Sequence, residues 1–230
     1  MRLISDKELI HERLGARFKD ALSDYDTKRR LDVLVGEFLG DIDLSGKRVL
    51  DVGTGLGFFA EALHGRGAAV TAVDIGETML ERVKVRVGCE CRRVDALALA
   101  EHFGLEAFDV VLSSECIEHT PSPNEAVRQM ARVLKPGGYL VLSTPNRVWE
   151  PVVTLATRLH LRPFDGLENF STFGSLREVM ECEGVPVIRE KGLHLLPFQV
   201  KLHRLSSWLD NHAQVLRRLM INLCVLGRKA

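Results

Sequence analysis

Three carboxylates and three glycines in the first half of the chain are the residues whose types and spacing could do chemistry. In VLDVGTGLG an apolar run ends in Asp51, and Gly53, Gly55 and Gly57 follow at two-residue intervals. Glycines between a strand and a helix let the backbone approach a ligand closely at the positive end of a helix dipole. The spacing differs from the G-x-G-x-x-G of dinucleotide binders. Taken alone, the loop fits a nucleotide-type site and a plain strand-to-helix turn equally well.

Two further carboxylates end the next two predicted strands. Asp74 follows Gly55 by nineteen residues, a position from which a carboxylate can accept hydrogen bonds from both hydroxyls of a ribose. Asp95 ends the next strand, where it could meet an adenine amino group. Adjacent parallel strands share one crevice at their carboxyl ends. Asp51, Asp74 and Asp95 together therefore predict a nucleotide-type site, although each alone could be a solvated strand-terminal residue.

Short apolar runs that alternate with helical stretches must position these residues. This β-α-β-α order predicts a parallel sheet covered on both faces. KPGG supplies a turn before the fifth strand. The strands are predicted at 48–52, 69–74, 91–95, 108–114 and 139–144, and the helices near 58–66, 77–86 and 123–133.

The rest of the chain completes the predicted domain. Helical spacing of apolar residues predicts two helices between residues 5 and 40, and beyond residue 146 a helix ends at Gly184. Two final strands, in VPVIREKGLHLLPF and MINLCVLGRK, form a hairpin interrupted by a helical stretch over 200–219. We expect one α/β domain with a doubly wound, Rossmann-like, seven-stranded sheet, parallel with a C-terminal antiparallel hairpin and with helices on both faces. Its parts are a helical cap (1–45), a cofactor-binding half (46–146) and an acceptor-side half with lid segments (147–230).

Composition and charge narrow the class of partner. The 230 residues can bury one sizeable core, and 31 basic side chains balance 31 acidic ones. Because no overall field gathers polyanions, we expect a small-molecule partner and no nucleic acid. The five scattered cysteines indicate reduced thiols in the cytoplasm, and no signal peptide or membrane span is predicted. We expect a monomer or a homodimer.

At this point the sequence resembles a known family. The series VLDVGTGLG, VDIG, VDA, FDVVLSS and LKPGGYLVLSTPNR, within 45–146, is similar to the class I S-adenosylmethionine-dependent methyltransferases. The resemblance implies the doubly wound seven-stranded sheet, S-adenosyl-L-methionine as cofactor, and cofactor contacts from Ile75 and Ala96. A sulfonium cation also suits a pocket of acidic strand ends better than a pyrophosphate does.

A closer resemblance within that class concerns SSECIEHTPSP and the following STPNR. These stretches are similar to the O-methyltransferases of ubiquinone biosynthesis and their relatives, which carry E-x-x-E-H after the fourth strand and an N-terminal Arg-Leu. The similarity implies that Arg30 holds the methionine carboxylate and that Ser114 lines the cofactor site. The resemblance is looser between residues 147 and 191.

Glu115, Glu118 and His119 match the E-x-x-E-H pattern and admit three interpretations. On a helical turn the three side chains share a face and could bind a divalent ion, Mg²⁺ or Zn²⁺, with open positions for a phenolate or catechol oxygen. Alternatively His119 acts alone as a general base, because its ordinary pKa of about 6.5 lies near working pH. In the third interpretation Glu118 and His119 only fix the loop before Pro121 by hydrogen bonding.

Three features beyond the cofactor half bear on the acceptor. The segment 147–172 contains Trp149, Phe164 and Phe170 and few charges, so it is either an acceptor-pocket wall or lid, or ordinary packing. His194 either faces the acceptor or is a structural histidine, and we favour the structural role. An apolar helix side over 198–220 (Phe198, Leu202, Leu205, Trp208, Leu209) either lies on a membrane and meets a lipid-tailed substrate or covers the sheet, which we favour.

The function predicted from these features is O-methylation of a hydroxyl on a small aromatic, quinol-like or lipid-like acceptor. The alternatives are an N-, C- or sugar-methyltransferase of natural-product biosynthesis, and a regulator that binds S-adenosylmethionine without chemistry, because fold alone does not separate these. A nicotinamide dehydrogenase fits the sheet and Asp74, but the glycine spacing and the KPGG turn argue against it.

Overall fold

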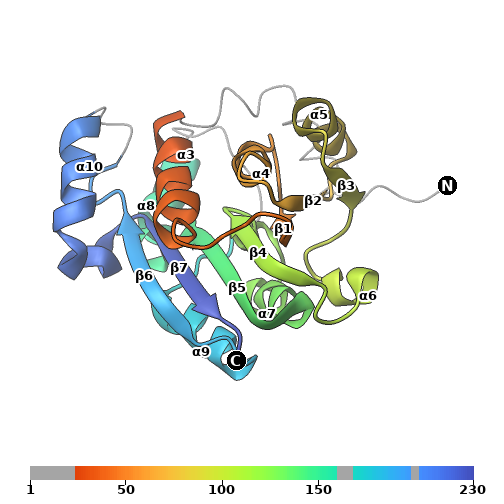
Figure 1. Ribbon diagram of the computed structural model, residues 1–230. Coiled ribbons are helices and arrows are strands. Elements are labelled where there is room, and N and C mark those ends of the chain that lie inside the picture. The colour runs from red at the N-terminus through yellow and green to blue at the C-terminus, as the bar shows by residue number, and fades with distance from the viewer. Residues whose placement is uncertain (1–23, 160–167, 198–201) are drawn as a thin grey trace.

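A computed structural model describes residues 24–159, 168–197 and 202–230, and within these ranges seven strands form one sheet in the order β3-β2-β1-β4-β5-β7-β6 (Figure 1). Neighbouring strands from β3 to β5 pair in parallel, and β7 runs antiparallel between β5 and β6. The doubly wound sheet with its antiparallel hairpin is therefore confirmed. The strands are β1 (Arg48–Val52), β2 (Ala69–Asp74), β3 (Glu90–Arg93), β4 (Phe108–Ser114), β5 (Leu134–Pro145), β6 (Val187–Leu193) and β7 (Asn222–Arg228).

Helices cover both faces of the sheet because its central strands are apolar on both sides. In β1 the consecutive residues Val49 and Leu50 point to opposite faces and belong to different buried clusters, and both side chains are fully shielded from solvent. One face packs against α6 (Leu99–Phe103), α7 (Pro123–Val133) and α9 (Phe173–Cys182). The other face packs against η1 (Asp32–Phe38), α4 (Phe58–His64) and α5 (Glu77–Val87).

The strand order creates a place for a ligand. From β1 the chain runs through β2 to β3 on one side, and β4 then pairs with the other edge of β1. In open α/β sheets the crevice at such a reversal, at the carboxyl ends of the strands, is where ligands bind. The fold therefore places the candidate site at the carboxyl ends of β1 and β4.

Three of the predicted strands, 48–52, 69–74 and 108–114, and the helix 123–133 have their predicted bounds. The third strand ends two residues earlier than predicted, at Arg93, and the short helix α6 was not predicted. KPGG is not a turn before the fifth strand, because β5 already begins at Leu134. The pairing register with β4 shifts across it, and Gly137 takes the irregular backbone with φ +74°.

Two helical segments precede β1. The helix α3 (Asp24–Leu31) continues into the π-helical η1, and the predicted helical residues before 24 lie outside the described residues. Arg66 donates hydrogen bonds to the carbonyls of Val35, Leu39, Gly40 and Ile42 at 2.8–3.3 Å. This one guanidinium therefore supplies hydrogen-bond donors to carbonyls in and just after the end of η1, where helical carbonyls lack donors within the helix.

The helix α10 (His203–His212) lies beside the β6 edge of the sheet (Figure 1). Its inward residues are Ser206 and Asp210, whereas Leu205 and Trp208 are 47% and 55% exposed. The prediction that the apolar side of this stretch covers the sheet is therefore wrong for the residues described here, because polar side chains occupy the inner face. In the described ranges no helix is long and apolar enough to cross a membrane.

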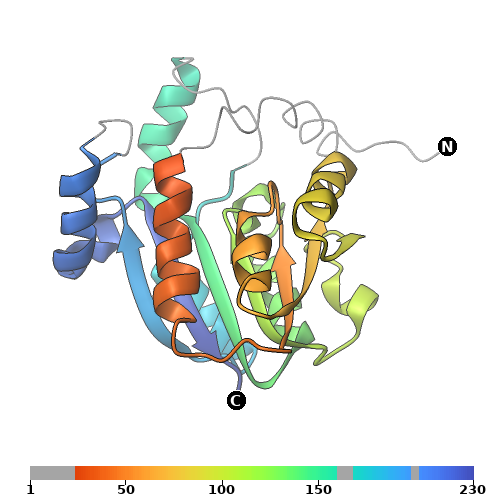
Figure 2. The same ribbon diagram turned by 45° about the horizontal axis from the view of Figure 1, so that its top comes forward.

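Further short elements join these parts: η2 (Ile117–His119), η3 (Arg147–Trp149), α8 (Glu150–Arg158) and η5 (Gln214–Leu219). Turned forward, the molecule shows α3 and α8 rising on the same side of the sheet as the carboxyl ends of the strands (Figure 2).

Candidate active site

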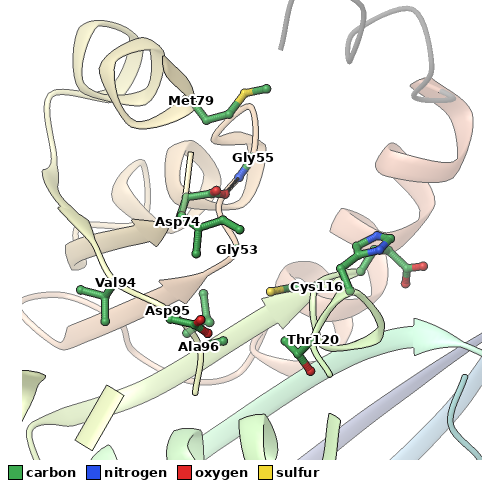
Figure 3. Close-up of a pocket in the computed structure, with 13 residues that line it drawn as sticks. Gly53, Gly55, Asp74, Met79, Val94, Asp95, Ala96, Cys116 and Thr120 are labelled. Atoms are coloured by element: carbon green, nitrogen blue, oxygen red, sulfur yellow. Dashed lines mark hydrogen bonds between the residues drawn. The ribbon is translucent and has the colours of Figure 1, made fainter. Parts of the chain in front are cut away.

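A pocket of about 810 Å³, counting the space at its open mouth, lies at the carboxyl ends of β1, β2, β3 and β4 (Figure 3). Segments that follow four different strands build it, as the strand order predicts. Its wall consists of Val52, Gly53, Gly55, Asp74, Ile75, Met79, Val94, Asp95, Ala96, Glu115, Cys116, His119 and Thr120. Seven of the residues predicted to bind a cofactor or to act in catalysis therefore meet in one pocket: Gly53, Gly55, Asp74, Ile75, Asp95, Ala96 and His119.

Close packing within the protein accounts for two of the glycines in the glycine loop, Gly53 and Gly57. Gly53 has φ +72°, and a Cβ atom there would lie 2.4 Å from the Sγ atom of Cys116. Gly57 has φ +79°, and its Cβ would lie 2.9 Å from Val83 in α5. Both positions thus exclude a side chain sterically and by backbone conformation. The glycines therefore let the loop pack against α5 and against Cys116, in the segment that follows β4.

Asp74 holds the glycine loop in place. One carboxylate oxygen accepts a hydrogen bond from the backbone N–H of Gly55 at 3.1 Å (Figure 3), and the other accepts one from Gly76 at 2.9 Å. Each carboxylate oxygen keeps further acceptor capacity. Since Asp74 also lines the pocket, a ligand hydroxyl can donate to it without breaking the loop.

Asp51 lies behind the pocket wall. Its side chain is buried and accepts a hydrogen bond from the Thr54 hydroxyl at 2.7 Å. Burial, with the nearby charge of Asp74, raises the pKa of Asp51 to about 7. The residue predicted as the first acidic strand end therefore supports the loop, and the pocket wall itself contains Asp74 and Asp95.

Asp95 stands at the exposed rim of the pocket, with Ala96 beside it (Figure 3). One of its carboxylate oxygens accepts a hydrogen bond from the backbone N–H of Leu97 at 2.9 Å. Ile75 lies in the wall after the second strand. The contacts of these residues with a cofactor remain a prediction.

Arg30 and Ser114 are joined to one another next to the pocket and are not part of its wall. Arg30 donates from Nη1 to the Ser114 hydroxyl at 2.7 Å, and Ser114 and Ser143 share a hydrogen bond of 2.9 Å. Ser143 donates to the Glu115 carboxylate at 2.9 Å. A chain of hydrogen bonds thus leads from Arg30 to Glu115, which does line the pocket.

The three predicted metal ligands do not form a metal-binding group. The carboxylate of Glu115 accepts hydrogen bonds from Ser143 and Asn222, and that of Glu118 accepts one from Thr144 at 3.1 Å. In the part of the chain that the structure describes, no three His, Cys, Asp or Glu side chains form a group that could hold a metal ion.

The cause is local backbone geometry. Glu115 has φ +53° and precedes a short 3-10 helix, so Glu115, Glu118 and His119 do not follow the face of an α-helical turn. The donor set does not fit Mg²⁺ or Zn²⁺, and this interpretation is corrected.

His119 reaches the pocket, while Glu118 is buried. The His119 Nε2 atom lies 3.8 Å from a Glu118 oxygen, and the imidazole is 26% exposed. Burial and the neighbouring Glu115 charge raise the pKa of Glu118 well above its usual value. The loop is fixed by Asn169, whose backbone N–H donates to the Glu118 carbonyl at 2.8 Å and whose side chain donates to the Thr120 carbonyl at 2.7 Å.

The structure describes three of the four residues within 147–194 that were predicted to bear on the acceptor. Phe170 is buried, and the Trp149 indole donates to the Leu219 carbonyl at 2.9 Å, while Phe164 lies outside the described residues. His194 is completely buried, with Nε2 2.9 Å from Asp26. The alternative that His194 faces the acceptor is therefore wrong, because its buried side chain is not part of the pocket wall.

Five wall residues were missed: Val52, Met79, Val94, Cys116 and Thr120. Each lies within five positions of a predicted site residue. Their nearness in sequence to the predicted strand ends was therefore the signal that could have identified them. Met79 is buried and lines the pocket at the same time.

Comparison with known proteins agrees with the geometry. The sheet order and the pocket at its reversal define a Rossmann-like methyltransferase fold. Two solved structures with it are the magnesium protoporphyrin IX methyltransferase of Synechocystis PCC 6803 (TM-score 0.69, 16% identity, 98% of this chain and 100% of that chain) and the phosphoethanolamine N-methyltransferase 2 of Haemonchus contortus (TM-score 0.70, 17% identity, 99% and 60%).

The family is shown by sequence. A family model described as a methyltransferase domain matches residues 24–190, so the chain belongs to this family. The ubiquinone biosynthesis O-methyltransferase of Pseudomonas fluorescens (strain Pf0-1) is 39% identical over 142 residues, which are 59% of this chain and 61% of that protein. The enzyme of the same name from Pseudomonas putida (strain W619) is 38% identical over the same lengths. The chain thus aligns with about three fifths of the curated relatives it matches.

Proposed function

We propose that this protein is an S-adenosyl-L-methionine-dependent methyltransferase that methylates a hydroxyl of a small aromatic, quinol-like or lipid-like acceptor. The observation that carries the proposal is the pocket at the carboxyl ends of β1 to β4, with Asp74 and Asp95 in its wall. Two carboxylates and a glycine loop fit a positively charged adenosyl donor. The names of the sequence relatives support the oxygen acceptor.

The chain's own residues have separate tasks in this proposal. When bound, S-adenosylmethionine supplies an electrophilic methyl group. Asp74 accepts hydrogen bonds from ribose hydroxyls while it holds Gly55, and Asp95 meets the base from the rim. His119, in the opposite part of the wall, removes the acceptor's hydroxyl proton at an imidazole nitrogen, a contribution worth roughly 10²- to 10⁴-fold in rate.

Binding and turnover test this division of labour. S-adenosylhomocysteine and NAD are titrated against the protein by calorimetry, and candidate phenols and catechols are followed by mass spectrometry for a gain of one methylene unit, with and without a chelator. We expect binding of the first ligand only, and turnover that the chelator leaves unchanged. Preferential NAD binding contradicts the proposal, and binding without methylation of any acceptor indicates a regulator.

Variants separate the roles. Asp74→Ala is expected to abolish donor binding. Asp95→Ala, which removes the side-chain acceptor of the Leu97 N–H, is expected to weaken donor binding without disturbing the glycine loop. His119→Ala is expected to keep binding and to slow turnover about 10²-fold or more. The exposed His64 on α4 provides the control substitution His64→Ala. Equal loss of binding in the Asp74 and His119 variants contradicts the assignment.

A further inference from the structure

A buried ionic cluster outside the pocket joins α3 to the loop after β6 and to α10. Asp26 and Arg30 of α3 form an ion pair at 2.7 Å, and the Nε2 atom of His194 lies 2.9 Å from the other Asp26 oxygen. Asp210 of α10 accepts a hydrogen bond from the backbone N–H of His194 at 2.9 Å. Charged groups are rarely buried unless they are paired, so this cluster calls for a reason.

Asp26 fixes the plane of the Arg30 guanidinium. Its Oδ2 atom accepts from Nε at 3.2 Å and from Nη2 at 2.7 Å, while Nη1 donates to Ser114. Of five N–H donors in a guanidinium, these three bonds leave two for a further acceptor among the described residues. The held guanidinium stands one residue from Glu115 of the pocket wall, through its bond to Ser114.

His194 fixes Asp26 in turn. Burial alone would raise the pKa of Asp26, but Arg30 and His194 hold it at about 2, so the carboxylate is ionised and only accepts hydrogen bonds. The Nε2 atom of His194 must therefore carry the proton that it donates to Asp26. The imidazole lies between Asp26 and Asp210 with no exposed surface, and the backbone of His194 has φ +64°.

Among the described residues that line the pocket there is no Lys or Arg to bind the carboxylate of a methyl donor. His119 is the one basic side chain among its lining residues in the described chain. An S-adenosylmethionine molecule carries a carboxylate on its amino-acid part, and a guanidinium is suited to bind a carboxylate in two-point fashion. Arg30 is the guanidinium bonded to the wall-forming segment.

We propose that His194 and Asp26 are positioning residues that orient Arg30 toward the carboxylate of the methyl donor. The inference rests on the proposed function and deepens it. Asp210 completes the device from α10, so the helix beside the β6 edge takes part in holding a donor-binding side chain on α3. The device therefore acts on the amino-acid part of the donor and leaves the adenosine part to Asp74 and Asp95.

Two ligands separate this role from a merely structural one. S-adenosylhomocysteine has the amino-acid carboxylate, and 5′-methylthioadenosine keeps the adenosine and the thioether without it. In the 230-residue chain, His194→Gln is expected to weaken S-adenosylhomocysteine binding about tenfold and to leave methylthioadenosine affinity within about twofold, since one charge-assisted hydrogen bond is lost. Calorimetric dissociation constants give both values.

A double-mutant comparison sharpens the test. Arg30→Met is expected to lower S-adenosylhomocysteine affinity more strongly, and adding His194→Gln to it is expected to cause no further loss, because both act on one contact. The control is His203→Gln, an exposed histidine that packs on the Tyr25 ring near His194. Circular dichroism establishes that each variant is folded.

The outcomes are distinct. Selective loss for S-adenosylhomocysteine supports the proposal, whereas equal loss for both ligands, or loss for neither, overturns it. If His194→Gln does not fold, Asp210→Asn loosens the same imidazole from the other side and must give the same selectivity at smaller size. A wild-type protein that binds neither ligand refutes the proposed function itself.

Discussion

Replacing Asp51 by Asn is expected to make the protein more stable at alkaline pH and to leave it nearly unchanged in acid. The buried carboxyl has its pKa raised from 3.8 to about 7, a difference of about three pH units at 1.36 kcal/mol each, or about 4 kcal/mol at most. Asn keeps an oxygen that accepts the Thr54 hydroxyl, now bonded to Asp51 at 2.7 Å, and it cannot ionise.

The sign follows from proton binding. Between about pH 4 and pH 7 the folded protein holds a proton on Asp51 that the unfolded chain has released. The free energy of unfolding therefore falls as pH rises, by up to 1.36 kcal/mol per pH unit, and levels off above the folded pKa. Asn at this position removes that decline.

Urea unfolding followed by circular dichroism at pH 5, 6, 7 and 8 measures the effect. The difference between Asp51→Asn and wild type should grow with pH and reach its limit near pH 8. The control is Asp109→Asn at the opposite ends of the strands, where Lys135 at 2.9 Å and the Arg48 N–H lower the pKa of Asp109 despite its burial, so its effect is constant over this range. A difference for Asp51→Asn that is equally constant refutes the reasoning.

Three further substitutions test the scaffold by urea unfolding. Gly53→Ala is expected to lower the free energy of unfolding by about 2–4 kcal/mol, because its Cβ meets Cys116 and φ is +72°. In a Cys116→Gly background the loss should fall to about 1–2 kcal/mol. An equal loss in both backgrounds contradicts the packing argument. Arg66→Ala is expected to lower the free energy of unfolding by about 2–3 kcal/mol, since four carbonyls each lose a hydrogen bond from the guanidinium. Recovery of full stability by Arg66→Lys would contradict the role of the planar guanidinium. Phe108→Ala removes a 1% exposed ring from the core and should lower the free energy of unfolding by about 3–5 kcal/mol. The control is Leu105→Ala, at 68% exposure, and a similar loss for this variant contradicts the prediction.

The sheet could be predicted because its signals are local. The strands β1, β2 and β4 each alternate or run apolar, and a carboxylate or serine pair marks where each ends. The pairing of strands six and seven around a helical stretch was confirmed. The bulge around Gly137 was missed, because its cause is the register with β4 and the approach of Lys229, whose carbonyl accepts from the Gly137 N–H.

The site was predictable where residues follow strand ends, as Asp74 and Asp95 do. It was not predictable where long-range packing decides. The i, i+3, i+4 spacing of Glu115, Glu118 and His119 suggested convergence, but φ +53° at Glu115 depends on its contacts with β5 and β7. The pair of Asp26 with His194 joins residues 168 positions apart, and no local pattern encodes such a contact.

The position of β7 has a consequence for how the chain is made. β7, which is synthesised after the other six strands, lies between β5 and β6, so β6 has no neighbour to pair with until residues Asn222–Arg228 arrive. Until then β5 presents an open edge, and such edges invite pairing with other chains. Truncation or delayed release of this last strand should therefore lead to aggregation during synthesis rather than to a smaller folded enzyme.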